Sequence, residues 1–219
     1  MLEKAQCILD KVAEHTNEIV LFHSLSGKDS IAMLDLCYPR FERVVCVFMY
    51  VVPNLSHLNR YASYIRKKYP KAEIMQTKHY ALYNYEKFGF LGTEKEDEQR
   101  QWRLRDIASY ITKEMGIEWS AYGFKQTDSL QRRLMLRGYE DNAIEWNTKK
   151  VYPLSEYTNK DVLAYIKDNN LKQPEDYGDN GRSMGTDITS AAYLKWLESN
   201  YPDDLKKVFD AFPLTRNII

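Results

Sequence analysis

A short run of small, polar and charged residues separates two apolar segments near the beginning of the chain. Its chemistry-bearing members are Ser24, Ser26, Gly27, Lys28, Asp29 and Ser30. A strand, a small-residue loop and a helix in this order direct backbone N–H groups and a helix N-terminus at one point. That point favours an anion, and lysine and hydroxyl groups add further contacts. The run therefore predicts a phosphate-binding loop.

Two other interpretations of this run are a Walker loop and an ordinary turn. A Walker loop is excluded, because there the lysine directly precedes Ser or Thr, whereas Asp29 separates Lys28 from Ser30. An ordinary strand-to-helix turn with Ser30 as N-cap and no ligand remains open. The run by itself does not decide between this turn and a phosphate loop.

A second polar segment follows the apolar residues 117–122. It contains Gly123, Lys125, Ser129, Arg132 and Arg133. Ligands of open parallel sheets lie beyond the carboxyl ends of the strands, so both polar segments are expected at the same edge. The basic side chains could neutralise phosphate or sulfate oxygens there. Taken alone, a solvated basic helix face explains this segment better.

The elements that must position these residues are strands and helices in alternation. Continuous apolar runs at 19–22 and 44–50 are typical of strands buried on both faces, and the helix between them predicts a right-handed parallel crossover. Further strands are expected at 73–76 and 117–122, with a small hairpin around 144–152. The expected fold is α/β, an open and mostly parallel five-stranded sheet with helices on both faces.

Helices are expected at several places. They cover 2–15, the segment after Ser30 to Pro39, a segment capped by Asn54 or Ser56, the segment from the capping box at Thr93–Glu96 to Met115, 130–138, and the segment after Thr158. Two more lie near 194–197 and 205–209 as a small helical C-terminal extension. Residues 1–170 are expected to form the nucleotide-binding α/β domain, and residues 171–219 a flexible loop and helices that pack on it.

Composition describes an ordinary globular protein. The 219 residues carry a formal net charge of zero, which gives no support to a generic nucleic-acid or membrane surface. We find neither an apolar run of membrane-spanning length nor a secretory signal, so a cytoplasmic location is expected. Cys7, Cys37 and Cys46 form no pair or cluster. They are expected to be buried and inert, with no zinc and no iron–sulfur site.

Four segments resemble one known superfamily and its members. Ser-Gly-Lys-Asp-Ser at 26–30 resembles the Ser-Gly-Gly-x-Asp-Ser loop of the PP-loop (adenine nucleotide alpha-hydrolase) superfamily, with one glycine fewer. Gly123, Lys125, Ser129 and Arg132 have the spacing of Gly-x-Arg-x-x-x-Ser-x-x-Arg in phosphoadenosine-phosphosulfate (PAPS) reductases, with lysine replacing the first arginine. Residues 152–166 are similar to that family's Pro-Leu-x-x-Trp-Thr-x-x-Asp-Val-x-x-Tyr-Ile segment. Residues 48–53, with His79 further on, are similar to PAPS-reductase-like proteins common in bacteriophages.

The resemblance implies a nucleotide site. ATP or a related adenine nucleotide would be bound with Mg²⁺, and an acceptor would attack the α-phosphorus with release of pyrophosphate. In this hypothesis Ser24, Ser26, Gly27, Lys28 and Ser30 hold the phosphates. Asp29 orients the loop or supports Mg²⁺, and Lys125 and Arg132 stabilise the transferred charge. Gly123, Ser129 and Arg133 also belong to the implied nucleotide-binding residues. His79 and Arg182 are weaker candidates for substrate contact.

One departure bears on the reaction. Sulfonucleotide reductases use a cysteine thiolate near the C-terminus, and this chain has no cysteine after Cys46. We therefore expect an ATP pyrophosphatase, adenylyltransferase or sulfurtransferase-like enzyme rather than a typical PAPS reductase. A nucleotide-binding module without turnover, or a reductase with an atypical cysteine, remains an alternative. The acceptor is unknown, and a homodimer or a partner subunit is left open.

Overall fold

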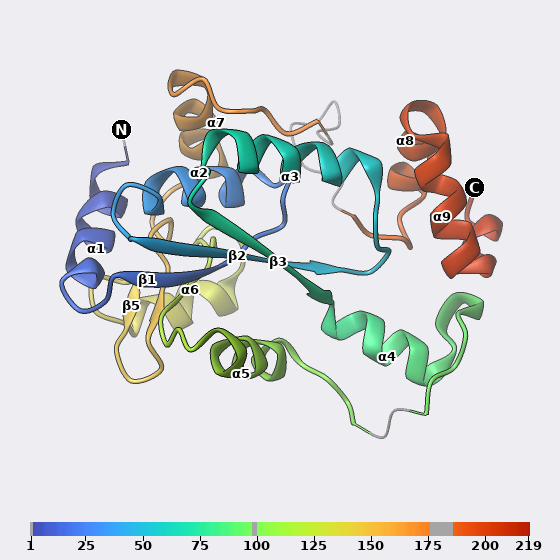
Figure 1. Ribbon diagram of the computed structural model, residues 1–219, viewed down its shortest axis with the longest axis horizontal. Coiled ribbons are helices and arrows are strands. Elements are labelled where there is room, and N and C mark those ends of the chain that lie inside the picture. Colours follow the sequence, from blue (N-terminus) through green and yellow to red (C-terminus); the bar gives the residue numbers. More distant parts are fainter. Residues whose placement is uncertain (1, 98–99, 176–185) are drawn as a thin grey trace.

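A six-stranded sheet organises the part of the chain that the structure describes (Figure 1). The computed structural model describes residues 2–97, 100–175 and 186–219. The strands are β1 (Glu18–Phe22), β2 (Arg43–Tyr50), β3 (Ala72–Lys78), β4 (Ser120–Ala121), β5 (Ile144–Glu145) and β6 (Lys150–Val151). Their order is β3-β2-β1-β4-β6-β5, and only β5 pairs antiparallel, with β6. The α/β fold and the hairpin are confirmed, and the sheet has six strands rather than the expected five because both arms of the hairpin join it.

The apolar runs form the centre of this sheet because both of their faces are buried. Val20 and Val45 face one hydrophobic cluster, whereas Leu21 and Cys46 face the other. The chain runs outward from β1 to β2 and β3 and then returns to place β4 on the other side of β1. The switch point of the sheet therefore lies between β1 and β4, where open α/β sheets bind ligands.

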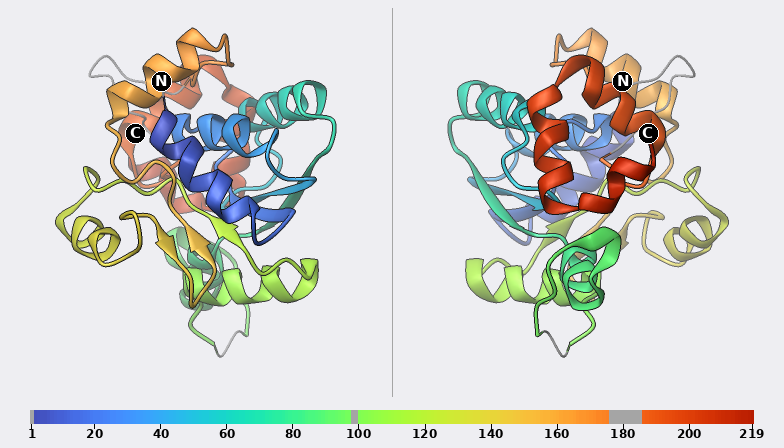
Figure 2. Two further views of the ribbon diagram at one scale, coloured as in Figure 1. Left: turned by 90° about the vertical axis from the view of Figure 1, so that its left-hand side faces the viewer. Right: turned by 90° about the vertical axis from the view of Figure 1, so that its right-hand side faces the viewer.

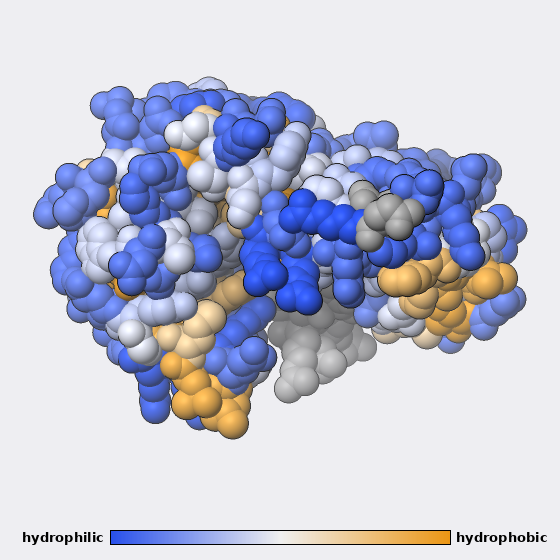
Figure 3. All heavy atoms as spheres, turned by 90° about the horizontal axis from the view of Figure 1, so that it is seen from below, coloured by the Kyte–Doolittle hydropathy of each residue, from blue (hydrophilic) through white to orange (hydrophobic). Residues whose placement is uncertain are grey.

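Helices cover both faces of the sheet, as expected (Figures 1 and 2). One face carries α1 (Glu3–Ala13), α2 (Lys28–Cys37), α3 (Ser56–Lys68) and α7 (Asn159–Asp168). The other carries α4 (Tyr80–Phe88), α5 (Leu104–Met115) and α6 (Leu130–Arg137). Figure 3 shows two apolar patches on this second side, over α6 and over the end of α4. Their exposed residues include Leu130, Leu134, Phe88 and Leu214.

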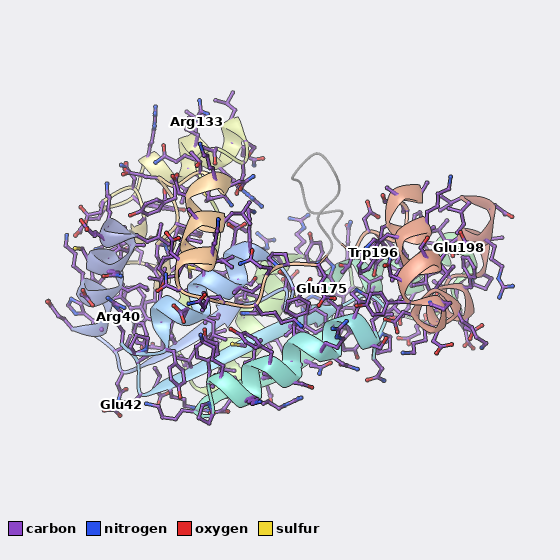
Figure 4. All side chains as sticks on the ribbon, turned by 90° about the horizontal axis from the view of Figure 1, so that it is seen from above. Arg40, Glu42, Arg133, Glu175, Trp196 and Glu198 are labelled. Carbon is purple, nitrogen blue, oxygen red and sulfur yellow. The ribbon has the colours of Figure 1, made fainter. Side chains whose placement is uncertain are left out.

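The C-terminal helices lie at one end of the molecule (Figure 1). They are α8 (Ala191–Asn200) and α9 (Pro202–Ala211), followed by the 3₁₀ turn η2 (Pro213–Asn217), which contacts η1 (Phe90–Gly92). Figure 4 shows Trp196 and Glu198 at this end, far from Arg40 and Glu42 at the opposite end. The C-terminal helices are confirmed, and a domain boundary at residue 170 stays a prediction.

The cap of α3 differs from the expectation. Neither Asn54 nor Ser56 caps it with its own side chain. Instead Asp204 of α9 accepts hydrogen bonds from the backbone N–H groups of Ser56 and His57, at 2.7 and 3.1 Å. The cap comes from a distant part of the chain, which local patterns cannot reveal.

The prediction that a helix begins at Thr93 was wrong, since α5 starts only at Leu104. Glu96 does not take part in a helix cap, because its carboxylate forms an ion pair with Lys78 at 3.0 Å. The main chain of Trp102 is held in both directions by the side-chain amide of Asn84. Asp106 supplies the cap instead, because its Oδ2 accepts from the backbone N–H of Arg103, the N-cap residue, at 2.8 Å. Contacts between segments therefore override a local capping signal.

The cysteines divide into two kinds. Cys37 and Cys46 are buried as expected, and burial raises the pKa of both thiols, that of Cys46 to about 12. Cys7 is exposed on α1, so the expectation of a buried thiol was wrong there. Among the described residues, no helix is both long and apolar enough to cross a bilayer.

Candidate functional site

A cavity of about 490 Å³ lies at the carboxyl ends of β1 and β4. Both polar segments that the sequence indicates line it. Its predicted members are Ser24, Gly27, Lys28, Asp29, Ser30, His79, Gly123, Lys125 and Arg132. The structure thus brings together, at the switch point, residues that are far apart in sequence.

The first segment forms a closed loop that ends in a helix. Ser30 Oγ accepts a hydrogen bond from the Ser24 N–H at 2.9 Å and lies 3.0 Å from Ser24 Oγ. Gly27 is the N-cap of α2, so the alternative with Ser30 as N-cap was wrong. A Cβ atom at Gly27 would lie 2.3 Å from Ser24 Oγ, so a larger residue there would displace this hydroxyl from its contact with Ser30. The N–H groups of the first turn have no partner within the helix, and they lie at the cavity.

A chain of alternating charges joins the two segments. Lys28 Nζ lies 2.9 Å and Lys125 Nζ 2.8 Å from the same atom, Asp29 Oδ2. Lys125 Nζ also lies 3.3 Å from Asp128 Oδ1, and Arg132 Nη1 lies 2.6 Å from Asp128 Oδ2. Three cations and two carboxylates leave one net positive charge beside the cavity.

Lys125 is the most enclosed member of this chain, with only 2% of its side chain exposed. A buried ammonium group requires paired carboxylates, and Asp29 and Asp128 supply them. Gly123 allows the segments to meet, because a Cβ there would lie 2.9 Å from Asp29 Cβ. Lys125 therefore fixes the loop after β4 against the first turn of α2.

Asp128 stays ionised in this setting. Burial opposes its ionisation, but the backbone N–H of Lys125 and the charges of Lys125 and Arg132 outweigh burial and lower its pKa. Asp29 Oδ1 is buried without a hydrogen-bond partner among the described residues. Such an acceptor is uncommon, so Asp29 has one oxygen to spare for a donor from a ligand or water.

Aromatic rings form the apolar wall of the cavity. Phe22 stacks on Tyr122 with centroids 4.8 Å apart and an interplanar angle of 6°. The guanidinium of Arg132 lies 4.0 Å from the centroid of Phe124. Planar apolar surface beside cationic groups suits a ligand with both a ring and phosphates.

Some predicted residues lie outside the cavity lining. Ser26 is buried in the loop, and Ser129 is the N-cap of α6 and accepts from the Arg132 N–H at 3.1 Å. Arg133 is exposed on α6 (Figure 4), where its Nε donates to the Gln126 carbonyl at 3.4 Å. Arg182, and most of the loop predicted to be flexible, lie outside the described residues.

His79 borders the cavity as the N-cap of α4. Its Nδ1 accepts from the Ala81 N–H at 3.1 Å, and burial lowers the pKa of its imidazole. A neutral ring that accepts at Nδ1 carries its proton on Nε2. His79 can therefore offer a ligand a neutral N–H donor.

Sequence reasoning missed Asp128 and the aromatic residues Tyr122 and Phe124, which line the cavity. Asp128 stands three residues after Lys125 and four before Arg132. This spacing on a turn and helix start is a usable signal for an ion-pair chain. The aromatic wall has no comparable signal, because seventeen tyrosines are scattered along the chain.

A larger cavity of about 710 Å³ lies between α4, residues 92–96 and α9. Among the described residues, it is lined by the carboxylates of Glu86, Glu94, Glu96 and Asp210 and by two lysines, Lys78 and Lys95. Repulsion between these carboxylates and phosphate oxygens makes it the poorer nucleotide site despite its volume.

The family model of the phosphoadenosine phosphosulfate reductase domain matches residues 19–192. The chain belongs to this family. The matched range includes both polar segments and the described sheet. No curated protein matches the sequence.

Two solved structures are similar to the chain at 15% identity. One is the NH3-dependent NAD synthetase from Campylobacter jejuni in complex with the nitrate ion, with a TM-score of 0.51, covering 99% of this chain and 94% of that one. The other is the U34-tRNA thiolase NcsA from Methanococcus maripaludis, with a TM-score of 0.49, covering 100% and 81%. The first supports the α/β fold.

The cofactor prediction needs a correction. The NcsA structure contains a [4Fe-4S] cluster, which contradicts the expectation, drawn here from cysteine spacing, that an iron–sulfur cluster is absent. Within the described residues, no group of three or more His, Cys, Asp or Glu side chains could hold a metal ion.

Proposed function

We propose that the chain binds ATP or a related adenine nucleotide in the cavity at the carboxyl ends of β1 and β4. The observation that carries this proposal is the joint lining by Lys28, Arg132 and the first turn of α2. These groups offer fixed positive charge and backbone donors for phosphate oxygens. The aromatic wall offers surface for the base.

The proposed reaction is adenylyl transfer. A nucleophilic atom of the acceptor attacks the α-phosphorus, a new bond forms there, and the bond to the bridging oxygen of the β-phosphate breaks. Pyrophosphate leaves with the electron pair of that bond. Lys28 and the α2 N-terminus would hold the departing phosphates, and Arg132 would stabilise charge on the transferred group. The ion pair of Lys125 with Asp29 would hold the two polar segments together.

Turnover of labelled ATP tests this proposal. The wild-type protein should release pyrophosphate once an acceptor is supplied, and Lys28→Ala and Arg132→Ala should reduce release at least tenfold. Arg133→Ala is the matched control, since it removes an exposed arginine of the same helix outside the cavity lining. Binding of ATP without release for any acceptor would favour a nucleotide-binding module instead.

A reductase with an atypical cysteine is the weaker alternative. Cys37 and Cys46 are buried with raised pKa values, and no cysteine lines the cavity in the described residues. Sulfite release from PAPS with a thiol donor, lost in Cys7→Ser, would contradict our exclusion of this reaction.

A further inference from the structure

The loop between β1 and α2 contains a residue in an uncommon conformation. Leu25 has a φ of 60°, in the left-handed region. This region is rarely adopted by residues with a branched apolar side chain and is readily adopted by glycine. The glycine of this loop, Gly27, has an ordinary φ of −71°. The loop therefore reverses its direction at a leucine and not at its glycine.

Two contacts hold Leu25 in this conformation. Its side chain is only 1% exposed and belongs to the main hydrophobic core. Its backbone N–H donates to His23 Nδ1 at 2.9 Å. The next residue closes the reversal, because the Ser26 N–H donates to the Ser24 carbonyl at 2.8 Å.

His23 is well placed to act as a fixed acceptor. The backbone N–H of His23 donates to the Val47 carbonyl at 2.9 Å, which extends the pairing of β1 with β2. Only 3% of His23 is exposed, and burial lowers the pKa of its imidazole to about 4. The imidazole is therefore neutral near pH 7, with its Nδ1 lone pair directed at Leu25.

The reversal at Leu25 sets the start of α2. It brings Ser24 back to Ser30, and it leads the chain into Gly27, whose carbonyl accepts the N–H of Ile31 at 3.0 Å. We propose that His23 is a positioning residue of the phosphate loop, whose Nδ1 holds Leu25 in the left-handed conformation so that the first turn of α2 faces the cavity. This inference rests on the proposed nucleotide site.

Variants at both positions separate a specific role from general packing. His23→Phe keeps a ring but removes the acceptor. His23→Asn keeps an acceptor, because asparagine bonds the N–H two residues on in an Asx turn. Leu25→Gly removes the need for the acceptor, since glycine adopts a positive φ without help. Wild type, the single variants and His23→Phe/Leu25→Gly form the set.

The first readout is hydrogen exchange of the Leu25 amide by NMR, which needs no nucleotide. We expect at least tenfold faster exchange in His23→Phe and near wild-type exchange in His23→Asn. Equal protection of this amide in His23→Phe and wild type would overturn the inference. A wild-type protein that protects this amide but binds no ATP would instead contradict the proposed function.

The second readout is ATP affinity. His23→Phe should weaken binding at least tenfold, and Leu25→Gly in that background should restore most of the loss. If the double variant binds no better than His23→Phe although both are folded by circular dichroism, the inference is wrong. Should His23→Phe fail to fold, His23→Asn decides: protection of the Leu25 amide equal to that of the wild type supports the inference, and loss of that protection overturns it.

Discussion

Lys125 Nζ lies 2.8 Å from Asp29 Oδ2 and joins the loop after β4 to the first turn of α2. The lysine is almost fully buried, and a second carboxylate, Asp128, completes its pairing. This contact links two segments that are distant in sequence and makes them one site. The family pattern has arginine at this position. Here the buried lysine pairs with two carboxylates and holds the two segments together, which does not require the bidentate guanidinium of an arginine.

The Asp29–Lys125 pair should be energetically coupled. Asp29→Asn leaves a buried ammonium with one carboxylate, so we expect a loss of about 2 kcal/mol in the free energy of unfolding. In the double variant Asp29→Asn/Lys125→Met the unbalanced charge is gone. Urea unfolding should therefore give a loss at least ~1 kcal/mol smaller than the sum of the single losses. Strict additivity would show that the pair does not hold the segments together.

The two neighbouring arginines of α6 should differ in function. Arg132 lines the cavity and Arg133 does not. Calorimetric titration with ATP should show that Arg132→Ala weakens binding by a factor of about 10 to 100, as for a lost charged hydrogen bond of about 1.5–3 kcal/mol. Arg133→Ala should change affinity less than about twofold, as expected of a surface charge. Equal effects of the two changes would mean that only the general positive charge of α6 matters.

Stability should depend on pH through His23. Its pKa in the folded protein is about 4, against 6.5 for an unperturbed histidine. Below pH 6.5 the unfolded chain takes up a proton that the folded protein does not, so folding stability falls as pH decreases from 6.5 to about 4. The span of 2.5 pH units corresponds to about 3 kcal/mol. Urea unfolding of His23→Asn across this range should show a flatter profile by roughly that amount.

The C-terminal helices should depend on Asp204. This carboxylate is fully buried, and besides the two N–H donors it accepts from Ser56 Oγ and His57 Nδ1 at 2.9 and 2.8 Å. Burial opposes its ionisation, but these donors together with Lys207 outweigh burial and lower its pKa. Asp204→Ala should cost about 3 kcal/mol or more. Exposed Asp203 is the control, and Asp203→Ala should cost less than about 0.5 kcal/mol.

The same carboxylate adds a second pH dependence at lower pH. Because the folded pKa of Asp204 is depressed, its contribution is fully present above the unfolded pKa of 3.8 and is lost as pH falls below that value. In Asp204→Asn, acid unfolding should lose this component below pH 3.8 and keep the His23 component above pH 4. If the stability of Asp204→Asn fell below pH 3.8 as steeply as that of the wild type, the ionised state of Asp204 would be contradicted.

Continuous apolar runs made the centre of the fold predictable. The strands around Val20 and Val45 are buried on both faces, and such runs have few alternatives in an α/β chain. The convergence of the two polar segments followed from the rule that parallel strands end at one edge. Contacts between distant segments were not predictable: Asp204 caps α3, and Lys78 holds Glu96 where a helix was expected.

The sequence indicated which cationic residues line the cavity, but not which carboxylates they pair with. Lys28, Lys125 and Arg132 stand out by type and spacing, whereas their roles depend on which carboxylate each one meets. Asp128 contacts both Lys125 and Arg132, and only the turn before α6 brings it there. The conformation of Leu25 had no signal in the sequence, because a leucine is not expected in the left-handed region.

A crystal structure of the protein soaked with ATP tests the central claim most directly. Our account predicts nucleotide density in the cavity at the carboxyl ends of β1 and β4, with phosphates at the N-terminus of α2 within reach of Lys28 and Arg132. Density in the acidic cavity between α4 and α9, or no bound nucleotide at saturating ATP, would contradict it.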